Sequence, residues 1–527
     1  MAGEQGLLAL VLHAHLPWVR HPEHATFLEE TWLFEAITES YLPLLETFER
    51  LAEDGIPCRI ALSLSPPLCA MLLDPLLRTR YLRHLETRIE LAEREVHRTR
   101  GDTQFQPLAA RHHAAFSAAR RRLVDGSRGD LIAAFARLAD AGVLRLMTTA
   151  ATHGLLPLLA TTPQAVTAQV AVGMAEFRRI FRREPAGFWL PECGYFAGLD
   201  DTLAAAHARF VCVETDALAL ASSPPAYGVY APIYCPAGVA AFARDATASA
   251  QVWSATVGYP GDPAYRDFYR DIGFDLDYAY VRPYLPPTGE RVATGVKYHR
   301  VTGPGDRKEP YDPAVAHATA ARHAAHYVGF CAGEIARIAA VLDRPPLLTV
   351  PFDAELFGHW WHEGPLWLEL LCRDIAADAR LRMVTPDEYL DAYPTNQVAE
   401  PNASTWGASG HHEVWLTAAN DWIYRHLHHA ADRMVALARR HPAADGAVRR
   451  ALDQAARELL LAQASDWPFM MSRGTTVAYA TKRVTDHLAR FIRLADEIER
   501  EAIDGAWLDA IAAADALFPA LDYRVFA

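Results

Sequence analysis

Short apolar segments alternate along this chain with longer stretches in which apolar residues recur at helical spacing. Six apolar segments predict buried strands, at residues 7–12, 59–63, 143–148, 186–190, 210–213 and 347–352. Between them, residues 75–96 and 114–141 predict solvated helices with Arg and Glu on the outer face. Strands that alternate with helices in this order predict an α/β fold with a parallel sheet.

The pattern changes at two places. Residues 222–245 are rich in Pro, Gly, Ala and Tyr, which predicts an irregular loop. From about residue 411 to the end, long Ala-, Leu- and Arg-rich patterns predict an all-helical domain.

Polar residues follow most of the predicted strands. In a parallel α/β barrel the strand-to-helix loops converge at the carboxyl ends of the strands, where active sites are built. We therefore expect one rim to collect these side chains, which are Ser63, Ser65, His153, Glu192, Glu214, Asp216 and Asp353.

Size, charge and cysteine content restrict the class of protein. A chain of 527 residues predicts one large domain with additions. The net charge of −13 and the scattered basic residues argue against nucleic acid or an anionic membrane as a partner. The chain shows no signal-peptide pattern and no long apolar run. Seven cysteines without a C-x-x-C pair predict buried thiols in a reducing compartment, so we expect a cytoplasmic protein.

Two carboxylates emerge from apolar segments among aromatic residues. Glu192 lies in the segment Trp189-Leu190-Pro191-Glu192-Cys193-Gly194-Tyr195, and Asp353 follows residues 346–352. Acetal bonds break most readily between a proton donor and a second carboxylate, and sugar rings stack on aromatic faces, so the pair indicates glycoside chemistry. Alternatively, Glu192 could cap a helix or pair with an Arg.

Asp353 and Glu355 are two residues apart, so a strand would direct both side chains to one side, one catalytic and one positioning. A buried ion pair is the alternative. His13 and His15 share the same spacing, either as metal ligands or as hydrogen-bond donors to a sugar.

The tryptophans and the remaining histidines also have two interpretations. Tryptophan is usually buried, so each of Trp360, Trp361, Trp406, Trp415 and Trp467 is either a core residue or a sugar platform. The histidines after residue 410 match no familiar zinc spacing. We predict neither a metal ion nor another cofactor, because two carboxylates suffice for glycoside chemistry.

Five motifs, in their order along the chain, resemble those of glycoside hydrolase family fifty-seven. More narrowly, they resemble the 1,4-α-glucan branching enzymes of that family, and the resemblance runs from Leu8 to about Phe469. The motifs are His13-Ala14-His15-Leu16-Pro17, Thr152-His153-Gly154-Leu155-Leu156-Pro157, Trp189 to Tyr195, Phe352 to Trp361, and Ala464-Ser465-Asp466-Trp467-Pro468-Phe469.

The resemblance implies an incomplete (β/α) barrel of seven parallel strands with a small helical insertion and a C-terminal all-helical domain. Applied to this sequence, it places the first part of the barrel at 1–192, the insertion at 193–228, the second part at 229–410 with a mobile loop at 226–245, and the helical domain at 411–527.

The resemblance also implies roles for single residues. Glu192 is similar to the family nucleophile, and Asp353 to the general acid/base. Tyr234 is similar to the tyrosine of the mobile loop over the site. The other positions similar to sugar-contacting residues are His13, His153, Trp406, Trp415 and Asp466, and we add His15, Trp360 and Trp467 from their places in the motifs.

These roles imply cleavage of an α-1,4 bond and transfer of the chain to a 6-hydroxyl, with retention, on amylose, amylopectin or glycogen. A hydrolase (amylase) or a 4-α-glucanotransferase would use the same carboxylates. From other classes, a metal-dependent carbohydrate deacetylase or a non-catalytic glucan-binding protein remain alternatives. The sequence leaves the oligomeric state open.

Overall fold

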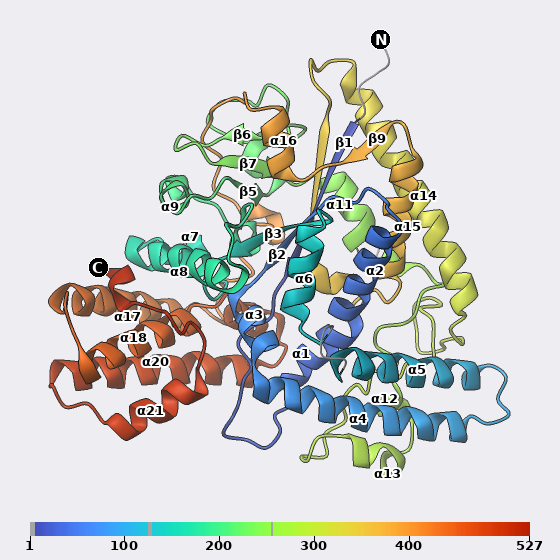
Figure 1. The fold of residues 1–527 in the computed structure, drawn as a ribbon, viewed down its shortest axis with the longest axis horizontal. Coiled ribbons are helices and arrows are strands. Elements are labelled where there is room, and N and C mark those ends of the chain that lie inside the picture. Colours follow the sequence, from blue (N-terminus) through green and yellow to red (C-terminus); the bar gives the residue numbers. More distant parts are fainter. Residues whose placement is uncertain (1–5, 125–128, 255–256) are drawn as a thin grey trace.

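The computed structural model describes residues 6–124, 129–254 and 257–527. A sheet lies at its centre, with helices on both sides (Figure 1). The strands are β1 (Gly6–Ala14), β2 (Ile60–Leu64), β3 (Leu144–Thr149), β4 (Phe188–Trp189), β5 (Phe210–Val213), β6 (Ile233–Tyr234), β7 (Ala240–Ala243), β8 (Leu347–Asp353) and β9 (Leu381–Met383).

The strand order is β6-β7-β5-β4-β3-β2-β1-β8, and β9 pairs with β1. Only the β6–β7 pair is antiparallel among the described pairs. From β7 to β8, seven strands therefore run parallel, and β6 and β8 end the order, so the barrel is incomplete. All six strands predicted from apolar segments are present. Every residue of β1 is buried, which is why such strands appear as continuous apolar runs.

The helices beside the sheet connect its strands. They are α1 (Glu30–Ala36), the π-helix η1 (Ile37–Tyr41), α2 (Leu42–Glu53), α3 (Pro66–Leu73), α6 (Leu131–Asp140), α7 (Leu156–Leu159), α8 (Pro163–Phe181), α9 (Leu199–Ala205), α10 (Thr215–Ala219), α11 (Ala246–Trp253), α14 (Pro313–Ala339), α15 (Gly364–Ala377) and α16 (Pro386–Ala392). Short 3-10 helices are η2 (Pro191–Cys193), η3 (Tyr259–Gly261), η4 (Arg282–Tyr284), η5 (Ala354–Leu356), η6 (Ala408–Gly410) and η7 (Tyr523–Phe526).

Several of these helices begin at an aspartate whose side chain accepts a backbone N–H of the first turn. Asp130, Asp245 and Asp312 cap α6, α11 and α14 in this way. An uncapped helix start leaves backbone donors without partners, and a cap of this kind is typically worth about 1 kcal/mol.

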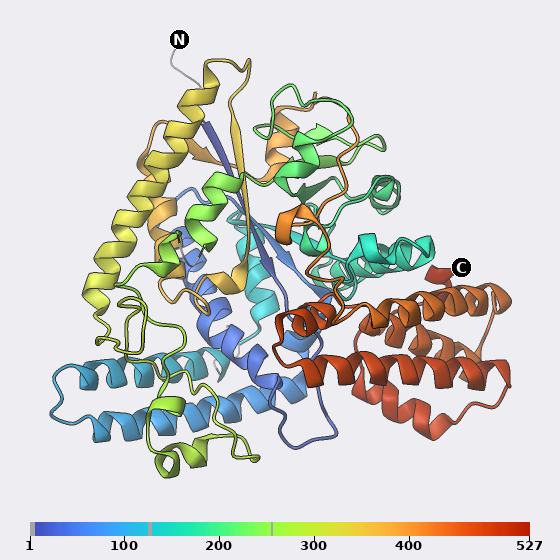
Figure 2. The same ribbon diagram turned by 180° about the vertical axis from the view of Figure 1, so that it is seen from behind.

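The predicted helical insertion at 193–228 is wrong. That range contains β5, which pairs with β4 and β7 inside the sheet. The helical protrusion is instead the long hairpin of α4 (Pro75–Arg98) and α5 (Phe105–Val124), with α12 (Ile272–Asp275) and α13 (Tyr278–Val281) beside it (Figures 1 and 2). Its periodicity is that of any solvated helix, so the sequence does not mark it as an insertion.

The predicted irregular loop at 226–245 is also wrong in part. It contains the hairpin of β6 and β7, closed by a turn in which Cys235 N–H donates to the carbonyl of Val239 (2.8 Å). Gly238 supplies the positive φ, 92°, that this turn requires. Pro and Gly thus mark a tight turn between two very short strands. The mobility of residues 226–245 stays a prediction.

The C-terminal helices form a separate bundle beside α3 and α8 (Figures 1 and 2). They are α17 (Trp422–Arg440), α18 (Gly446–Ala462), α19 (Asp466–Arg473), α20 (Val477–Glu499) and α21 (Gly505–Ala514). The predicted helical domain is confirmed, although residues 411–421 are irregular. The indole N–H of Trp18 donates to Asp515 (3.0 Å), so a buried polar contact joins this bundle to the loop after β1.

None of the helices among the described residues is long and apolar enough to cross a membrane.

Candidate active site

The register of β1 brings polar residues together at the carboxyl ends of neighbouring strands. His13 lies opposite Ser63 of β2 on one side and opposite Asp353 of β8 on the other. Strand-to-helix loops converge at this end of a parallel barrel. The rim predicted from the sequence is therefore present, and β1 is at its centre.

Glu192 lies on a tight turn directly after β4. Its φ is 58° and that of Cys193 is 51°, so two consecutive non-glycine residues adopt the left-handed conformation. Such residues cost about 1–3 kcal/mol each and are concentrated at functional sites. Two hydrogen bonds hold the turn: Cys193 N–H donates to the carbonyl of Leu190, and Trp406 N–H donates to the carbonyl of Glu192, both at 2.9 Å.

The carboxylate of Glu192 receives two hydrogen bonds from distant parts of the chain. The indole N–H of Trp406 donates at 2.7 Å and the hydroxyl of Ser465 at 2.9 Å. Burial raises the pKa of Glu192 to about 7, against the opposing effect of these two donors. The two donors thus offset part of the cost of burying its charge, and the group is about half ionised near neutral pH.

Three imidazoles lie side by side next to Glu192. His13 stacks on the indole of Trp189 (4.5 Å between ring centroids), and His15 stacks on His153 (4.1 Å). Each ring nitrogen has a protein partner: His13 pairs with Ser63 (3.0 Å) and His153 (3.0 Å), His15 with Ser65 (2.8 Å) and Asp466 (3.1 Å), and His153 also with Ser465 (2.9 Å).

The three imidazoles differ in charge. Burial, followed by the charge of His15, lowers the pKa of both His13 and His153, so both are neutral. Burial also acts to lower the pKa of His15, but the charge of Asp466 and its hydrogen bond raise it overall. A neutral imidazole has one donor and one acceptor nitrogen, which the hydrogen bond between His13 and His153 requires.

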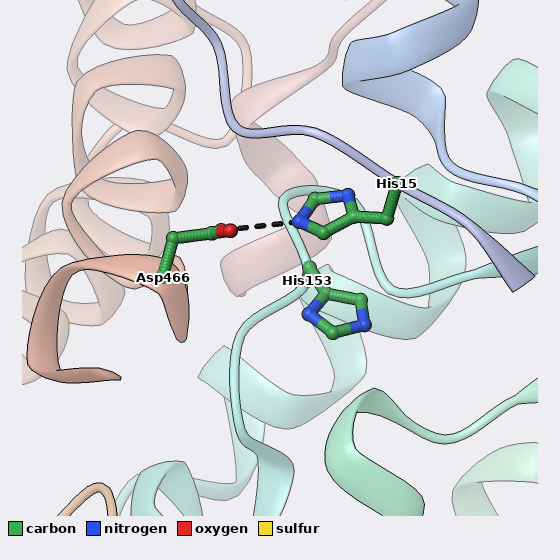
Figure 3. Close-up of side chains that lie close together, drawn as sticks. All are labelled: His15, His153 and Asp466. Carbon is green, nitrogen blue, oxygen red and sulfur yellow. Dashed lines mark hydrogen bonds and ion pairs between the residues drawn. The ribbon is translucent and has the colours of Figure 1, made fainter. Parts of the chain in front are cut away.

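His15, His153 and Asp466 offer three atoms of metal-ligand type within 4.8 Å of one another (Figure 3). The carboxylate of Asp466 faces His15 Nε2 at 3.1 Å. Because every imidazole nitrogen is already paired, a metal ion would have to displace these hydrogen bonds. The metal-free site stays a prediction.

Asp353 ends β8 with its side chain accessible to solvent. Protein atoms nevertheless surround it, and this partial burial, followed by the charges of Glu355 and Glu192, raises its pKa well above the usual range. No ion pair involving Asp353 occurs among the described residues. The alternative of a buried ion pair is therefore not supported.

Glu355 is held in place by two hydrogen bonds from other segments. It accepts hydrogen bonds from the backbone N–H of His15 (3.1 Å) and from the hydroxyl of Tyr41. Tyr41 lies on the π-helix η1, a conformation that is rare and frequent at functional sites. Tyr41 and Ser465 are two further residues of the site that were not predicted from the sequence. Their signal was weak: each is a single polar residue near a helix boundary, far along the chain from its partner.

The predicted aromatic contacts divide into three groups. Trp406 lies against Glu192, as the prediction requires of a residue in the site. Trp360 is 54 % exposed. Trp467 is fully buried and its indole donates to the carbonyl of Leu461 (2.8 Å), so its prediction as a sugar contact is wrong. Trp415 is also buried. Its ring packs against Gly407, the residue after Trp406.

Tyr234 does not lie over the carboxylates in this structure. It pairs with Ala240, the first residue of β7, and Ala240 pairs with Phe210 at the start of β5. Tyr234 is thus at the amino-terminal ends of the parallel strands, whereas Glu192 and Asp353 are at the carboxyl ends of β4 and β8. Tyr234 is fixed there because its N–H donates to Gln397 (2.8 Å) and its carbonyl accepts from Ala399 (3.0 Å). The predicted lid role is therefore wrong for this conformation.

Glu214, another predicted rim residue, is structural: it caps α10 and pairs with Arg244 (2.6 Å).

Comparison with known proteins places this geometry in a family. A family model described as glycosyl hydrolase family 57 matches residues 9–401, which include Glu192 and Asp353. The chain belongs to this family. A second model, described as the C-terminal part of 1,4-α-glucan branching enzyme, matches residues 426–526, which include Ser465 and Asp466.

Relatives of known name agree with the family but differ in activity. A 1,4-α-glucan branching enzyme of Thermococcus kodakarensis is 32 % identical over 94 % of this chain and 74 % of its own. Among solved structures, an α-amylase of Thermotoga maritima is 40 % identical with a TM-score of 0.93, each chain being 99 % covered. A family 57 branching enzyme of Pyrococcus horikoshii is 30 % identical with a TM-score of 0.89, covering 100 % of this chain and 97 % of that one.

Proposed function

We propose that this protein is a 1,4-α-glucan branching enzyme that cleaves an α-1,4 bond and transfers the released chain to a 6-hydroxyl. One observation carries the proposal. Ser465 and Asp466 belong to the part of the chain that matches the branching-enzyme C-terminal model, and they contact Glu192 and His15 directly. The C-terminal domain thus contributes to the site itself, beside Glu192.

In the first step, Glu192 attacks the anomeric carbon while Asp353 protonates the departing oxygen. The two groups need opposite protonation states. The raised pKa of Asp353, due first to burial, keeps its proton available. The donors Trp406 and Ser465 stabilise the Glu192 carboxylate. The product is a covalent glycosyl-enzyme and a free reducing-end fragment.

In the second step, Asp353 has become a carboxylate and accepts the proton of the attacking hydroxyl. That hydroxyl is the 6-hydroxyl of a glucan in branching and water in hydrolysis. Two displacements at the same carbon retain the α configuration. Asp466 and His15, which are both partly exposed, are placed to hold the hydroxyls of the sugar that Glu192 attacks, and the buried, hydrogen-bonded pair of His13 and His153 supports them.

We further propose amylose, amylopectin and glycogen as substrates, and the cytoplasm as the compartment. All seven cysteines are free and buried. The sulfur atoms of Cys58 and Cys372 lie only 3.5 Å apart without a bond, as expected in a reducing environment.

The proposal is tested by incubating the protein with amylose and counting reducing ends before and after enzymatic debranching. We expect new branch points to outnumber new free reducing ends. Reducing ends alone would mean an amylase, as the Thermotoga relative is named. Altered chain lengths without branches would mean a 4-α-glucanotransferase, and no product would leave only glucan binding. Loss of activity with a chelator would favour metal-dependent chemistry.

One prediction concerns the pH dependence of the nucleophile. Trp406→Phe removes an indole N–H that donates to Glu192. A hydrogen bond to a charged group is worth about 1.5–3 kcal/mol, and one pKa unit is about 1.36 kcal/mol. The pKa of Glu192 should therefore rise further, and the acid limb of kcat/KM should move to higher pH by about one unit.

The measurement is the pH profile of amylose cleavage by wild type and Trp406→Phe. Trp422→Phe, which changes a half-buried tryptophan of α17, is the control and should leave the profile unchanged. An acid limb that does not move in Trp406→Phe would remove the indole from the control of Glu192.

A further inference from the structure

A pair of stacked aromatic rings lies outside the cluster around Glu192. The indole of Trp360 packs on the ring of Phe268 with 4.5 Å between centroids and 26° between planes. Phe268 is half-buried, whereas Trp360 is 54 % exposed. One face of the indole is thus covered by Phe268, and the side chain still presents a large apolar surface to solvent. We call these two residues the aromatic platform.

The aromatic platform is joined to the catalytic carboxyl through the backbone. Trp360 N–H donates to the carbonyl of Glu355 (3.2 Å), and Glu355 is two residues beyond Asp353 and accepts the N–H of His15. A single exposed tryptophan is ordinary on a protein surface. This one is anchored on the loop that follows Asp353, the proposed general acid/base, and is bonded to Glu355 within that loop.

The loop beneath Trp360 is held rigidly. His359 Nδ1 lies 2.6 Å from a carboxylate oxygen of Glu39, and the N–H of His359 donates to Ser40 (3.0 Å). Gly358 has φ 113° and lies so close to the carbonyl of Glu39 that a Cβ atom there would clash. Glu39 and Ser40 belong to the π-helix η1, so the same irregular turn that orients Glu355 through Tyr41 also fixes the next part of the loop.

A buried cation supports the other ring. The ammonium of Lys297 lies 4.3 Å from the centroid of Phe268, and only 3 % of Lys297 is exposed. Desolvating an ammonium is costly, and the attraction between a cation and an aromatic ring offsets part of that cost. The edge of His359 meets Phe268 as well (5.2 Å, 82°). Phe268 is therefore held from two sides, and it in turn holds the indole.

We propose that the aromatic platform of Trp360 and Phe268 is a subsite for the α-glucan on the leaving-group side of the cleaved bond, which is also the side of the incoming acceptor. The assignment rests on the proposed function. Asp353 protonates the departing oxygen, so the loop that continues from Asp353 borders the leaving chain. Asp466 and His15 lie instead on the side of Glu192 and face the sugar that becomes attached. An apolar indole face suits the face of a glucose ring.

The proposal predicts that Trp360→Ala affects only substrates with sugar on the leaving side. With amylose, kcat/KM should fall about tenfold, as the loss of one stacking contact implies. With α-maltotriosyl fluoride the leaving position holds only fluoride, so the initial rate of fluoride release should not change. Trp360→Phe should recover part of the rate with amylose. Trp253→Ala, whose indole is also 54 % exposed, is the matched control and should leave both rates unchanged.

An equal fall with both substrates, or no fall with either, would overturn the assignment. The proposed function is tested separately, by counting the branch points that the wild type forms in the same amylose samples. A wild type that cleaves amylose without branching fails as a branching enzyme, while the comparison of the two substrates still decides the platform. A wild type that turns over neither substrate would overturn both proposals.

Discussion

The Glu192→Gln variant is expected to lose turnover of amylose by about 10⁴-fold or more, because an amide cannot form the glycosyl ester on which both half-reactions depend. The amide is nearly the same size, and it can still accept a hydrogen bond from Trp406 or Ser465, which hold the carboxylate now. Branch points and reducing ends formed on amylose provide the measurement.

The stability of this variant separates chemistry from folding. Burial raises the pKa of Glu192 to about 7, so above that pH the folded protein carries the cost of an ionised buried carboxylate, and this cost is absent below the unfolded pKa. Glu192→Gln should therefore unfold at the same temperature as wild type at pH 8, or at a higher one. Glu184→Gln, at an exposed carboxylate, is the control and should keep full activity. Near-normal turnover by Glu192→Gln would exclude Glu192 as the nucleophile.

The Asp353→Asn variant should show a comparably large loss on amylose but a selective one. Fluoride leaves without protonation, so the first displacement on α-maltotriosyl fluoride should remain fast, whereas the second lacks its base. The expected record is a burst of about one fluoride per enzyme followed by slow turnover. Asp140→Asn, which changes an exposed aspartate, is the control. It should turn over the fluoride like wild type, without a burst.

The protonation of Asp353 also predicts the direction in which the rate on amylose changes with pH. In wild type the group must be protonated, and burial, followed by the charges of Glu355 and Glu192, raises its pKa. The rate of the first step on amylose should fall as the pH rises through that pKa. This basic limb should be missing from the residual activity of Asp353→Asn. Equal losses on amylose and on the fluoride, or an unchanged basic limb, would place the proton donor elsewhere.

The sheet was predictable because its parallel strands are buried on both faces and therefore appear as continuous apolar runs. The run before Asp353 and the run before His13 are of this kind, and both strands are present with the expected polar residues at their ends. The family motifs supplied the pairing of Glu192 with Asp353. Strands of two residues, such as β6, are too short to produce a periodicity and were taken for part of a loop.

The other errors arise where tertiary packing decides the outcome. Trp467 and Trp406 both stand in polar motifs, and only the packing of the C-terminal bundle shows that one is fully buried while the other reaches Glu192. Tyr234 follows a segment with the expected composition, but its backbone pairs with residues 397–399 at the far edge of the sheet. No local pattern in the sequence reports such a long-range contact.

The contribution of Ser465 likewise depends on how the C-terminal helices dock. Ser465 lies between His153 and Glu192, accepting from Nδ1–H of His153 on one side and donating to the carboxylate on the other. Segments as far as 312 residues apart in the sequence therefore share one hydrogen-bonded cluster. The site is complete only when the bundle and the barrel are assembled.

The most direct test of the account is to trap the covalent glycosyl-enzyme. Asp353→Asn is mixed with α-maltotriosyl fluoride, quenched in acid, digested and analysed by mass spectrometry. The account predicts one maltotriosyl adduct, on the peptide that contains Glu192, and none when Glu192→Gln is added to the same chain. An adduct on another residue, or fluoride release with no adduct at any time point, would contradict it.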